Sequence, residues 1–254
     1  MGKSRDEINK TEQDYWNNKK LDRKKIKPLR RHAFHYSYKR ERRLLNEVIK
    51  TTEGKNVLEL GSYVWSDWIK NKVVPKKLTC INISEAELQT GIDHAKGVSF
   101  ETEFHLMDAN NLTFPDESFD VVIGGAILHH LDIEKTLSHV HRVLKPNGVI
   151  IFLEPLNMNP LYKIYRKLNP QERTPDEHAL VSSDFKIIKN KFTFDHYFMD
   201  FFTVIFGFIS LKIFGDKNYD NWLNKLGFNL DVFCSKIPFL YVFFARVVLF
   251  GKKK

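Results

Sequence analysis

Side chains that can bind a polar ligand or move a proton follow a series of short apolar runs in this sequence. Glu59, Asn82 and Asp108 offer carboxylate or amide groups, and each comes at or just after the end of one such run. His129 and His130 form an imidazole pair, and imidazole is the side chain that titrates nearest to neutral pH. These residue types support recognition of a polar ligand combined with proton transfer.

The apolar runs that carry these residues are typical of buried parallel strands. We expect strands over residues 56–60, 78–83, 104–107, 119–124 and 149–153. Between them, Ser84 with Glu87 forms a capping box that starts a helix, and Asp132 precedes apolar residues at helical spacing. The alternation predicts an α/β fold, a doubly wound, Rossmann-like, mostly parallel sheet with helices on both faces.

In an open sheet of this kind, ligands bind beyond the carboxyl ends of the strands, where the strand order reverses. The residues that follow the first four predicted strands are therefore expected to converge on one site. They are Glu59, Gly61, Asn82, Asp108, Ala109, Gly124 and Gly125.

The regular alternation ends after Glu154, and this change divides the chain into four expected parts. Residues 1–50 form a basic, aromatic arm, and residues 51–154 form the ligand-binding core. Residues 155–215 form an aromatic-rich insertion or lid that builds an acceptor pocket. Residues 216–254 complete the core, with closing strands expected over 227–232 and 245–249.

The net charge of +9 is confined to the arm, because residues 1–50 hold 16 Lys and Arg against 7 Asp and Glu. Such an arm suits nucleic-acid phosphates, anionic lipid or an acidic substrate, or it is simply a solvated amphipathic helix. Two cysteines give no disulfide framework, and neither a signal peptide nor an apolar run of ~18 residues is apparent. A cytoplasmic protein is expected, with possible peripheral contact at the inner membrane face.

The run from Val57 to Val149 resembles the class I S-adenosylmethionine-dependent methyltransferases, specifically the small-molecule, methyltransferase type 11-like family. Three motifs carry the resemblance more specifically than the rest. They are Asp108-Ala109 before Leu112-Thr113-Phe114-Pro115, then Ser118-Phe119-Asp120-Val121-Val122, then Leu128-His129-His130-Leu131. The resemblance implies S-adenosylmethionine as the cofactor, and no metal is expected.

The resemblance also assigns parts of the cofactor to individual residues. Glu59 would serve the cationic methionine end, Asn82 the ribose hydroxyls, and Asp108 with Ala109 the adenine edge. The remaining members of the expected cofactor set are Gly61, Ser62, Ile83 and Gly125.

This sequence departs from the family pattern in two places. The usual Gly-x-Gly-x-Gly loop reads Gly61-Ser62-Tyr63-Val64-Trp65, and Asn82 stands where an acid is usual. The loss of glycines disfavours a dinucleotide, whose pyrophosphate needs close backbone approach. Tyr63 and Trp65 are candidates to wall the methionine pocket instead.

The histidine pair lies beside the expected position of the transferable methyl group. His130 is the first candidate for the base that removes the acceptor's proton, and His129 is the second. The alternative is that the pair caps a helix or packs beneath the cofactor. His178, beside Glu177 in the inserted part, is a third candidate, although residues 174–177 also read as an ordinary helix start.

Three functions fit these features. The first is O-methylation of a small or lipid- or glycan-linked acceptor, with the aromatic segment 192–214 either a membrane-facing lid or buried core. The second is RNA methylation through the basic arm. The sequence lacks the Asn/Asp-Pro-Pro-aromatic motif of base-amino methylation and a Pro-Cys nucleophile, which disfavours this reading. The third is a non-catalytic scaffold that keeps the fold.

Overall fold

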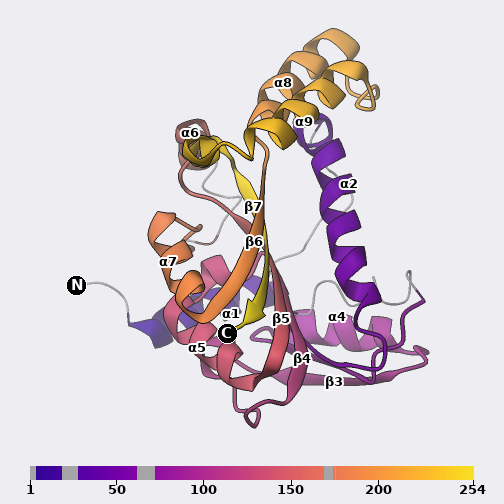
Figure 1. Ribbon diagram of the computed structural model, residues 1–254, viewed down its shortest axis with the longest axis vertical. Helices are drawn as coiled ribbons and strands as arrows, with labels where there is room; N and C mark the ends of the chain where they lie inside the picture. The colour runs from indigo at the N-terminus through magenta and orange to yellow at the C-terminus, as the bar shows by residue number, and fades with distance from the viewer. Residues whose placement is uncertain (1–3, 19–27, 62–71, 169–173, 175) are drawn as a thin grey trace.

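The computed structural model describes residues 4–18, 28–61, 72–168, 174 and 176–254. Its centre is a seven-stranded sheet of order β3-β2-β1-β4-β5-β7-β6 (Figure 1). β1 to β5 pair in parallel, and β7 runs antiparallel to both β5 and β6. The strands are β1 (Asn56–Leu60), β2 (Lys77–Asn82), β3 (Glu101–Leu106), β4 (Phe119–Gly125), β5 (Leu144–Pro155), β6 (Phe192–Met199) and β7 (Arg246–Lys253). The predicted mostly parallel α/β sheet is confirmed.

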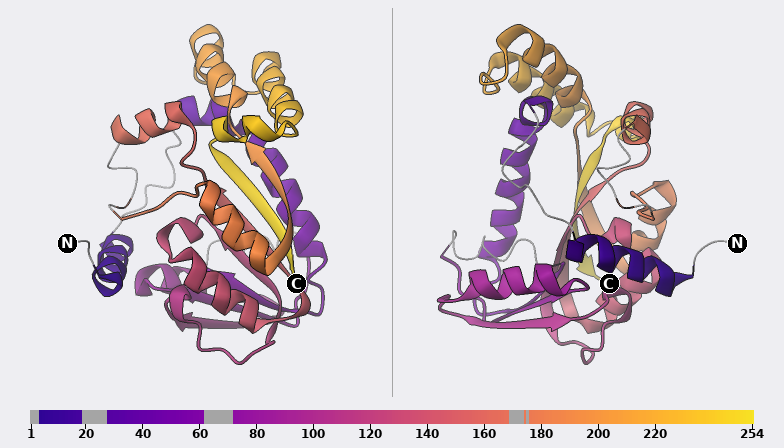
Figure 2. Two further views of the ribbon diagram at one scale, coloured as in Figure 1. Left: turned by 60° about the vertical axis from the view of Figure 1, so that its left-hand side comes forward. Right: turned by 180° about the vertical axis from the view of Figure 1, so that it is seen from behind.

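Helices cover both faces of the sheet, as the alternation predicts. α5 and α7 lie on one face, and α2 and α4 lie on the other (Figures 1 and 2). The α-helices are α1 (Arg5–Asn18), α2 (Pro28–Lys50), α4 (Glu85–Ala95), α5 (Ile133–Val143), α6 (Pro160–Leu168), α7 (Ser182–Lys191), α8 (Phe202–Phe214) and α9 (Trp222–Cys234). The described residues also form the short 3-10 turns η1 (Ala109–Asn111), η2 (Leu128–His130) and η4 (Pro238–Phe243).

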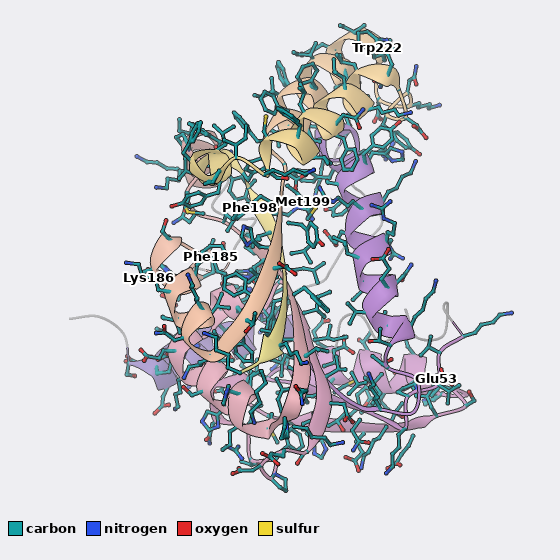
Figure 3. The ribbon with its side chains drawn as sticks, in the orientation of Figure 1. Glu53, Phe185, Lys186, Phe198, Met199 and Trp222 are labelled. Carbon is teal, nitrogen blue, oxygen red and sulfur yellow. The ribbon has the colours of Figure 1, made fainter. Side chains whose placement is uncertain are left out.

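Each face of the sheet has its own apolar core. The core on the α5 and α7 side includes Leu137 and Ile188, and the core on the α2 side includes Ile49, all almost inaccessible to solvent. Successive side chains of β6 contribute to the two cores in turn, because Phe198 faces α7 and Met199 faces α2 (Figure 3). Burial of these side chains supplies the main favourable term in folding.

The two predicted helix starts are confirmed. The Ser84 hydroxyl accepts a hydrogen bond from the backbone N–H of Glu87 at 3.2 Å, and α4 begins directly after it. The Asp132 carboxylate accepts from the backbone N–H of Lys135 at 3.0 Å at the start of α5. Each cap satisfies an N–H group that has no partner within its helix, which is worth about 1 kcal/mol.

One of the two predicted closing strands is wrong. Residues 227–232 lie inside α9, whereas residues 245–249 lie at β7 as predicted. The buried residues Leu223, Gly227 and Asp231 are spaced by four, which is a helical period. A Cβ at Gly227 would lie 2.9 Å from Phe206 Cβ, so this glycine lets α9 approach α8 closely.

The missing closing strand lies inside the part predicted as an insertion. β6 pairs with β7 along its whole length, and it therefore belongs to the core sheet. The aromatic segment 192–214 is divided between this strand and α8. α8 and α9 form a hairpin that packs against the N-terminal half of α2 and projects beyond the end of the sheet (Figure 1).

Asp231 of α9 holds the start of α8. Its carboxylate accepts hydrogen bonds from the backbone N–H of Phe202 at 2.7 Å and from the Thr203 hydroxyl at 2.8 Å. Burial, with the nearby Asp200 carboxylate adding to it, raises the pKa of Asp231 to about 6. The folded chain therefore binds this proton more tightly than an unfolded chain, in which the ordinary pKa is 3.8.

We expect this shift to make stability depend on pH. The stabilisation by the Asp231 proton is complete below the unfolded pKa and is lost as the pH rises through about 6. Urea unfolding of the wild type and of Asp231→Asn from pH 4 to pH 7 measures it. The free energy of unfolding of the wild type should fall relative to the variant by up to about 3 kcal/mol. A difference that does not change with pH would contradict the raised pKa.

Candidate functional site

The carboxyl ends of β1, β2, β3 and β4 meet at one edge of the sheet, and the strand order reverses between β1 and β4. Glu59 lies one residue before the end of β1 and is almost fully buried, and Cys80 on β2 lies 3.5 Å from its carboxylate. Gly61 follows with a φ of 89°, a left-handed conformation that glycine adopts without strain. Ser62, Tyr63 and Trp65 lie outside the described residues.

Asn82 links the first two loops of this edge. Its side-chain N–H donates to the carbonyl of Gly61 at 2.9 Å, and its side-chain oxygen accepts from the backbone N–H of Ser84 at 2.9 Å. An acid at this position could not make the first of these bonds, because an ionised carboxylate has no donor. The asparagine therefore has a local role in fixing the loop after β1.

Asp108 caps η1 and is also contacted from the N-terminal arm. Its Oδ1 accepts from the backbone N–H of Asn110 at 2.8 Å, and its Oδ2 accepts from the side chain of Asn9 at 2.7 Å. Ala109 is buried beside it. Gly125 ends β4, and at its neighbour Gly124 a Cβ would lie 2.6 Å from Ile127. The chain can therefore turn tightly here into η2.

α1 lies along this edge (Figure 2). Asn9 contacts Asp108, Gln13 donates to the carbonyl of Ile83 at 3.0 Å, and Asn17 accepts from the Ser84 hydroxyl at 2.7 Å. Sequence reasoning left the arm open between contact with a partner molecule and a solvated amphipathic helix, and it did not predict this docking on the strand ends. The signal was present, because three amide side chains spaced by four form one polar stripe on a helix.

His129 is buried and held by a carboxylate. Its Nδ1 lies 2.7 Å from Glu154 Oε2, and Glu154 Oε1 accepts from the backbone N–H groups of Ile127 and Leu128 at 3.0 and 2.9 Å. One carboxylate thus fixes both the turn and the ring. Sequence reasoning did not include Glu154 in the site, although an acid at the end of β5 is the same signal that identified Asp108.

His130 is paired with a carboxylate from α1. Its Nδ1 lies 3.2 Å from Glu12 Oε2 and 3.2 Å from the Thr174 hydroxyl. Arg5 donates to its backbone carbonyl at 2.8 Å, and Trp16 packs edge-on against its ring. Burial acts to raise the pKa of Glu12, but hydrogen bonding and charge from His130 outweigh it, so the pKa lies below its usual value.

The segment before α7 brings Glu177 to the histidine pair, but not the His178 ring. Glu177 Oε2 lies 3.9 Å from His129 Nε2, and its side chain is 7% exposed. The backbone N–H of His178 donates to the carbonyl of His129 at 2.6 Å, while its imidazole is 58% exposed and lies 3.6 Å from Asp184. Residues 174–177, read as a possible helix start, lie outside the helices described.

A separate hollow of about 300 Å³ lies at the opposite edge of the sheet. Its walls come mainly from the amino ends of β1, β2 and β4. The lining residues are Asn56, Lys77, Thr79, Glu103, Phe114, Ser118 and Phe119. Because ligands of such sheets bind at the carboxyl ends of the strands, we do not assign the candidate site to this hollow.

Curated methyltransferases are similar to the central part of the chain. Residues 59–152 match a family described as methyltransferase domain. Demethylmenaquinone methyltransferase of Bacteroides fragilis is 30% identical over 106 residues, which cover 39% of this chain and 43% of the relative. The same enzyme of Listeria welshimeri is 31% identical over 122 residues, with 44% and 50% covered. The chain thus spans half or less of these curated relatives.

Solved structures resemble the chain over nearly its full length. Geranyl diphosphate C-methyltransferase from Streptomyces coelicolor A3(2) has a TM-score of 0.66 at 11% identity, covering 97% of this chain and 98% of that one. The N-methyltransferase NodS from Bradyrhizobium japonicum WM9 has a TM-score of 0.57 at 12% identity, covering 97% and 98%. The fold is that of the class I S-adenosylmethionine-dependent methyltransferases. Within this fold, residues 59–152 match the methyltransferase domain.

Solved structures with a similar fold include a protein with a different activity. A solved [4+2]-cyclase, SpnF, has a TM-score of 0.53 at 16% identity, covering 83% of this chain and 80% of that one. The reaction of this chain must therefore be argued from its site. Among the described helices, we find none that combines the length and apolar character needed to cross a bilayer.

Proposed function

We propose that this protein transfers the methyl group of S-adenosylmethionine to a small-molecule acceptor. The observation that carries the proposal is the meeting of Glu59, Asp108 and the histidine pair at the carboxyl edge of a methyltransferase domain. Carboxylates suit the cationic and amine groups of the cofactor, and imidazole suits removal of a proton at neutral pH.

The cofactor residues are proposed as the resemblance assigns them. Glu59 binds the methionine end, Asn82 the ribose hydroxyls, and Asp108 with Ala109 the adenine. Gly61, Ser62, Ile83 and Gly125 complete the set. Supporting this arrangement, Asn82 ties the loop after β1 to the loop after β2, which fixes the positions proposed for the methionine end and the ribose relative to each other. Asp108 is already oriented by the η1 backbone.

The proposed reaction is a displacement at the methyl carbon. The acceptor's lone pair forms the new bond to the methyl group, the carbon–sulfur bond breaks, and S-adenosylhomocysteine leaves. His130 takes the acceptor's proton. Glu12, 3.2 Å from its ring, stabilises the imidazolium that forms, and Glu154 holds His129 beside it. His178 remains a third candidate, although its exposed ring faces Asp184.

The acceptor class is proposed as a hydroxyl on a small or lipid- or glycan-linked molecule. The relatives include C- and N-methyltransferases, so oxygen as the acceptor atom is this proposal's own choice. Incubation with methyl-labelled cofactor and separate lipid, glycan and RNA extracts tests it. Label in the lipid or glycan extract is expected. Label confined to RNA would support the alternative RNA reading, and no label would support a scaffold.

The α8 and α9 hairpin supports an acceptor presented at a membrane. Its exposed apolar side chains follow one stripe on each helix, and Trp222, at 67% exposure, points outward at the tip (Figure 3). The stripes comprise Ile205, Phe208, Ile209 and Ile213 of α8 and Trp222, Leu226 and Phe233 of α9. Exposed Lys212 and Lys225 on the same helices suit anionic headgroups. α1, in contrast, lies at the sheet edge far from this hairpin (Figures 1 and 2).

We expect the protein to float with liposomes through this hairpin. Binding should increase with anionic lipid and fall with added salt, because the lysine contribution is screened. Serine at both Trp222 and Phe233 should reduce the bound fraction by removing apolar insertion. Leu106→Ser is the matched control, because Leu106 is an exposed apolar residue on β3. If the control and the double variant bind equally, or the wild type never floats, the hairpin is not a membrane surface.

A further inference from the structure

His129, His130 and Glu177 place metal-binding atoms around one small volume. One ligand atom from each of these residues lies within 4.8 Å of the others. The two histidines come from η2, and Glu177 comes from the segment that leads to α7. Two imidazoles and one carboxylate are a ligand set that binds divalent transition metals in proteins.

The contacts around His129 match those of a metal ligand. Metal-bound histidines usually donate their second N–H to a carboxylate, and Glu154 lies 2.7 Å from His129 Nδ1. This leaves Nε2 facing Glu177 at 3.9 Å, which is too long for a hydrogen bond. Two ligands about 2.1 Å from one ion in tetrahedral geometry lie roughly 3.4 Å apart, so a small closure suffices.

The electrostatics of the cluster favour a cation. Glu12, Glu154 and Glu177 surround the two imidazoles with side-chain exposures of 6%, 0% and 7%. Arg5 brings one positive charge, through its bond to the His130 carbonyl. Three buried carboxylates therefore lie around the two imidazoles, and a cation among them would offset the cost of burying negative charge.

We propose that one divalent transition-metal ion binds to His129, His130 and Glu177. Glu154 orients His129, and Glu12 lies beside His130. The imidazoles favour Zn²⁺, Co²⁺ or Fe²⁺ over Mg²⁺ or Ca²⁺, which prefer oxygen ligands. This differs from the expectation of no metal drawn from sequence. A bound ion occupies imidazole lone pairs, so His130 acts as the base of the proposed reaction only in metal-free protein.

The test is titration of chelator-treated, full-length protein with Co²⁺, followed by visible absorption and calorimetry. One ion per chain is expected, with the absorption of a nitrogen- and oxygen-ligated Co²⁺ centre. His129→Ala and Glu177→Gln should each weaken binding at least about 10-fold, and Glu154→Gln about 10-fold or more through lost orientation. His178→Ala is the matched control, because its exposed ring lies outside the cluster, and it should bind Co²⁺ as the wild type does.

Absence of saturable binding would overturn the proposal, as would unchanged binding in His129→Ala and Glu177→Gln. Loss of Co²⁺ binding in His178→Ala, but not in His129→Ala and Glu177→Gln, would place the ion elsewhere and would also overturn the proposal. Circular dichroism of each variant confirms that it is folded. Neither cofactor nor acceptor is present, so the outcome is separate from that of the proposed methyl transfer.

Discussion

Replacing His130 with alanine is expected to lower the turnover of methyl transfer about 10²-fold or more in metal-free protein, while the affinity for S-adenosylmethionine stays nearly unchanged. The reason is that imidazole accepts the acceptor's proton and Glu12 stabilises the charged ring at 3.2 Å. The proton then has no positioned acceptor in the variant. Single-turnover rates with labelled cofactor, together with calorimetric affinities, measure the two effects separately.

Two neighbouring histidines serve as comparisons. His129→Ala should reduce turnover less, because this ring is held by Glu154 rather than assigned to the proton. His178→Ala should leave turnover unchanged, since its imidazole faces Asp184. An equal loss of cofactor affinity in His130→Ala would show that the ring is part of the binding pocket. Full activity of His130→Ala would show that His130 is not the general base.

Replacing Arg246 with alanine is expected to lower the free energy of unfolding by about 3 to 5 kcal/mol. The guanidinium bonds Asp200, which is fully buried, and lies 2.7 Å from Glu41. It also lies over the rings of Phe34 and Tyr38. These carboxylates raise the pKa of Arg246, so it stays charged. Its removal leaves a buried carboxylate without its cation, and this cost exceeds the value of the ion pair itself.

Urea unfolding at pH 7 measures this change. Lys96→Ala is the matched control, because it breaks a pair with Asp93 in which both side chains are more than half exposed. Exposed pairs are worth little, so a change of about 0.5 kcal/mol or less is expected there. If both variants lose a similarly small free energy of unfolding, Arg246 does not hold α2 and β7 together as expected.

Much of the core could be predicted because local signals and tertiary structure agree there. β1, β2, β4 and residues 149–153 of β5 contain short apolar runs, which are typical of strands that are buried on both faces. Ser84 and Asp132 are capping residues whose geometry depends only on their own helix. The parallel topology predicted that the residues at the strand ends lie at one edge of the sheet, and their roles in binding a cofactor stay predictions.

The C-terminal third was harder because its pattern is ambiguous. β6 is an edge strand of the sheet, and only Asp200 and Phe201 separate its aromatic sequence from that of α8. α9 was read as a strand because a short apolar run does not distinguish strand from buried helix. The close contacts of α8 with α2 at Gly207 and of α9 with α8 at Gly227 are long-range information.

Parts of the candidate site were also missed because they depend on contacts between segments far apart in the sequence. Charge and composition located the arm, but not the docking of Asn9, Gln13 and Asn17 on the strand ends. Glu154 and Glu12 acquire their roles only when β5 and α1 meet η2. The amide stripe of α1 marks a polar face in the sequence, but only the folded chain shows which strand ends this face contacts.

Calorimetric titration of the full-length, metal-free protein with S-adenosylmethionine tests the central claim most directly. We predict one site of micromolar affinity for the cofactor and for S-adenosylhomocysteine. Asp108→Ala should weaken binding by roughly 1 to 3 kcal/mol, because the adenine amine loses its hydrogen-bond partner. Asn9→Ala, which removes only the α1 contact to Asp108, should weaken it less. Undetectable binding at millimolar cofactor would contradict the claim that this chain is a working methyltransferase.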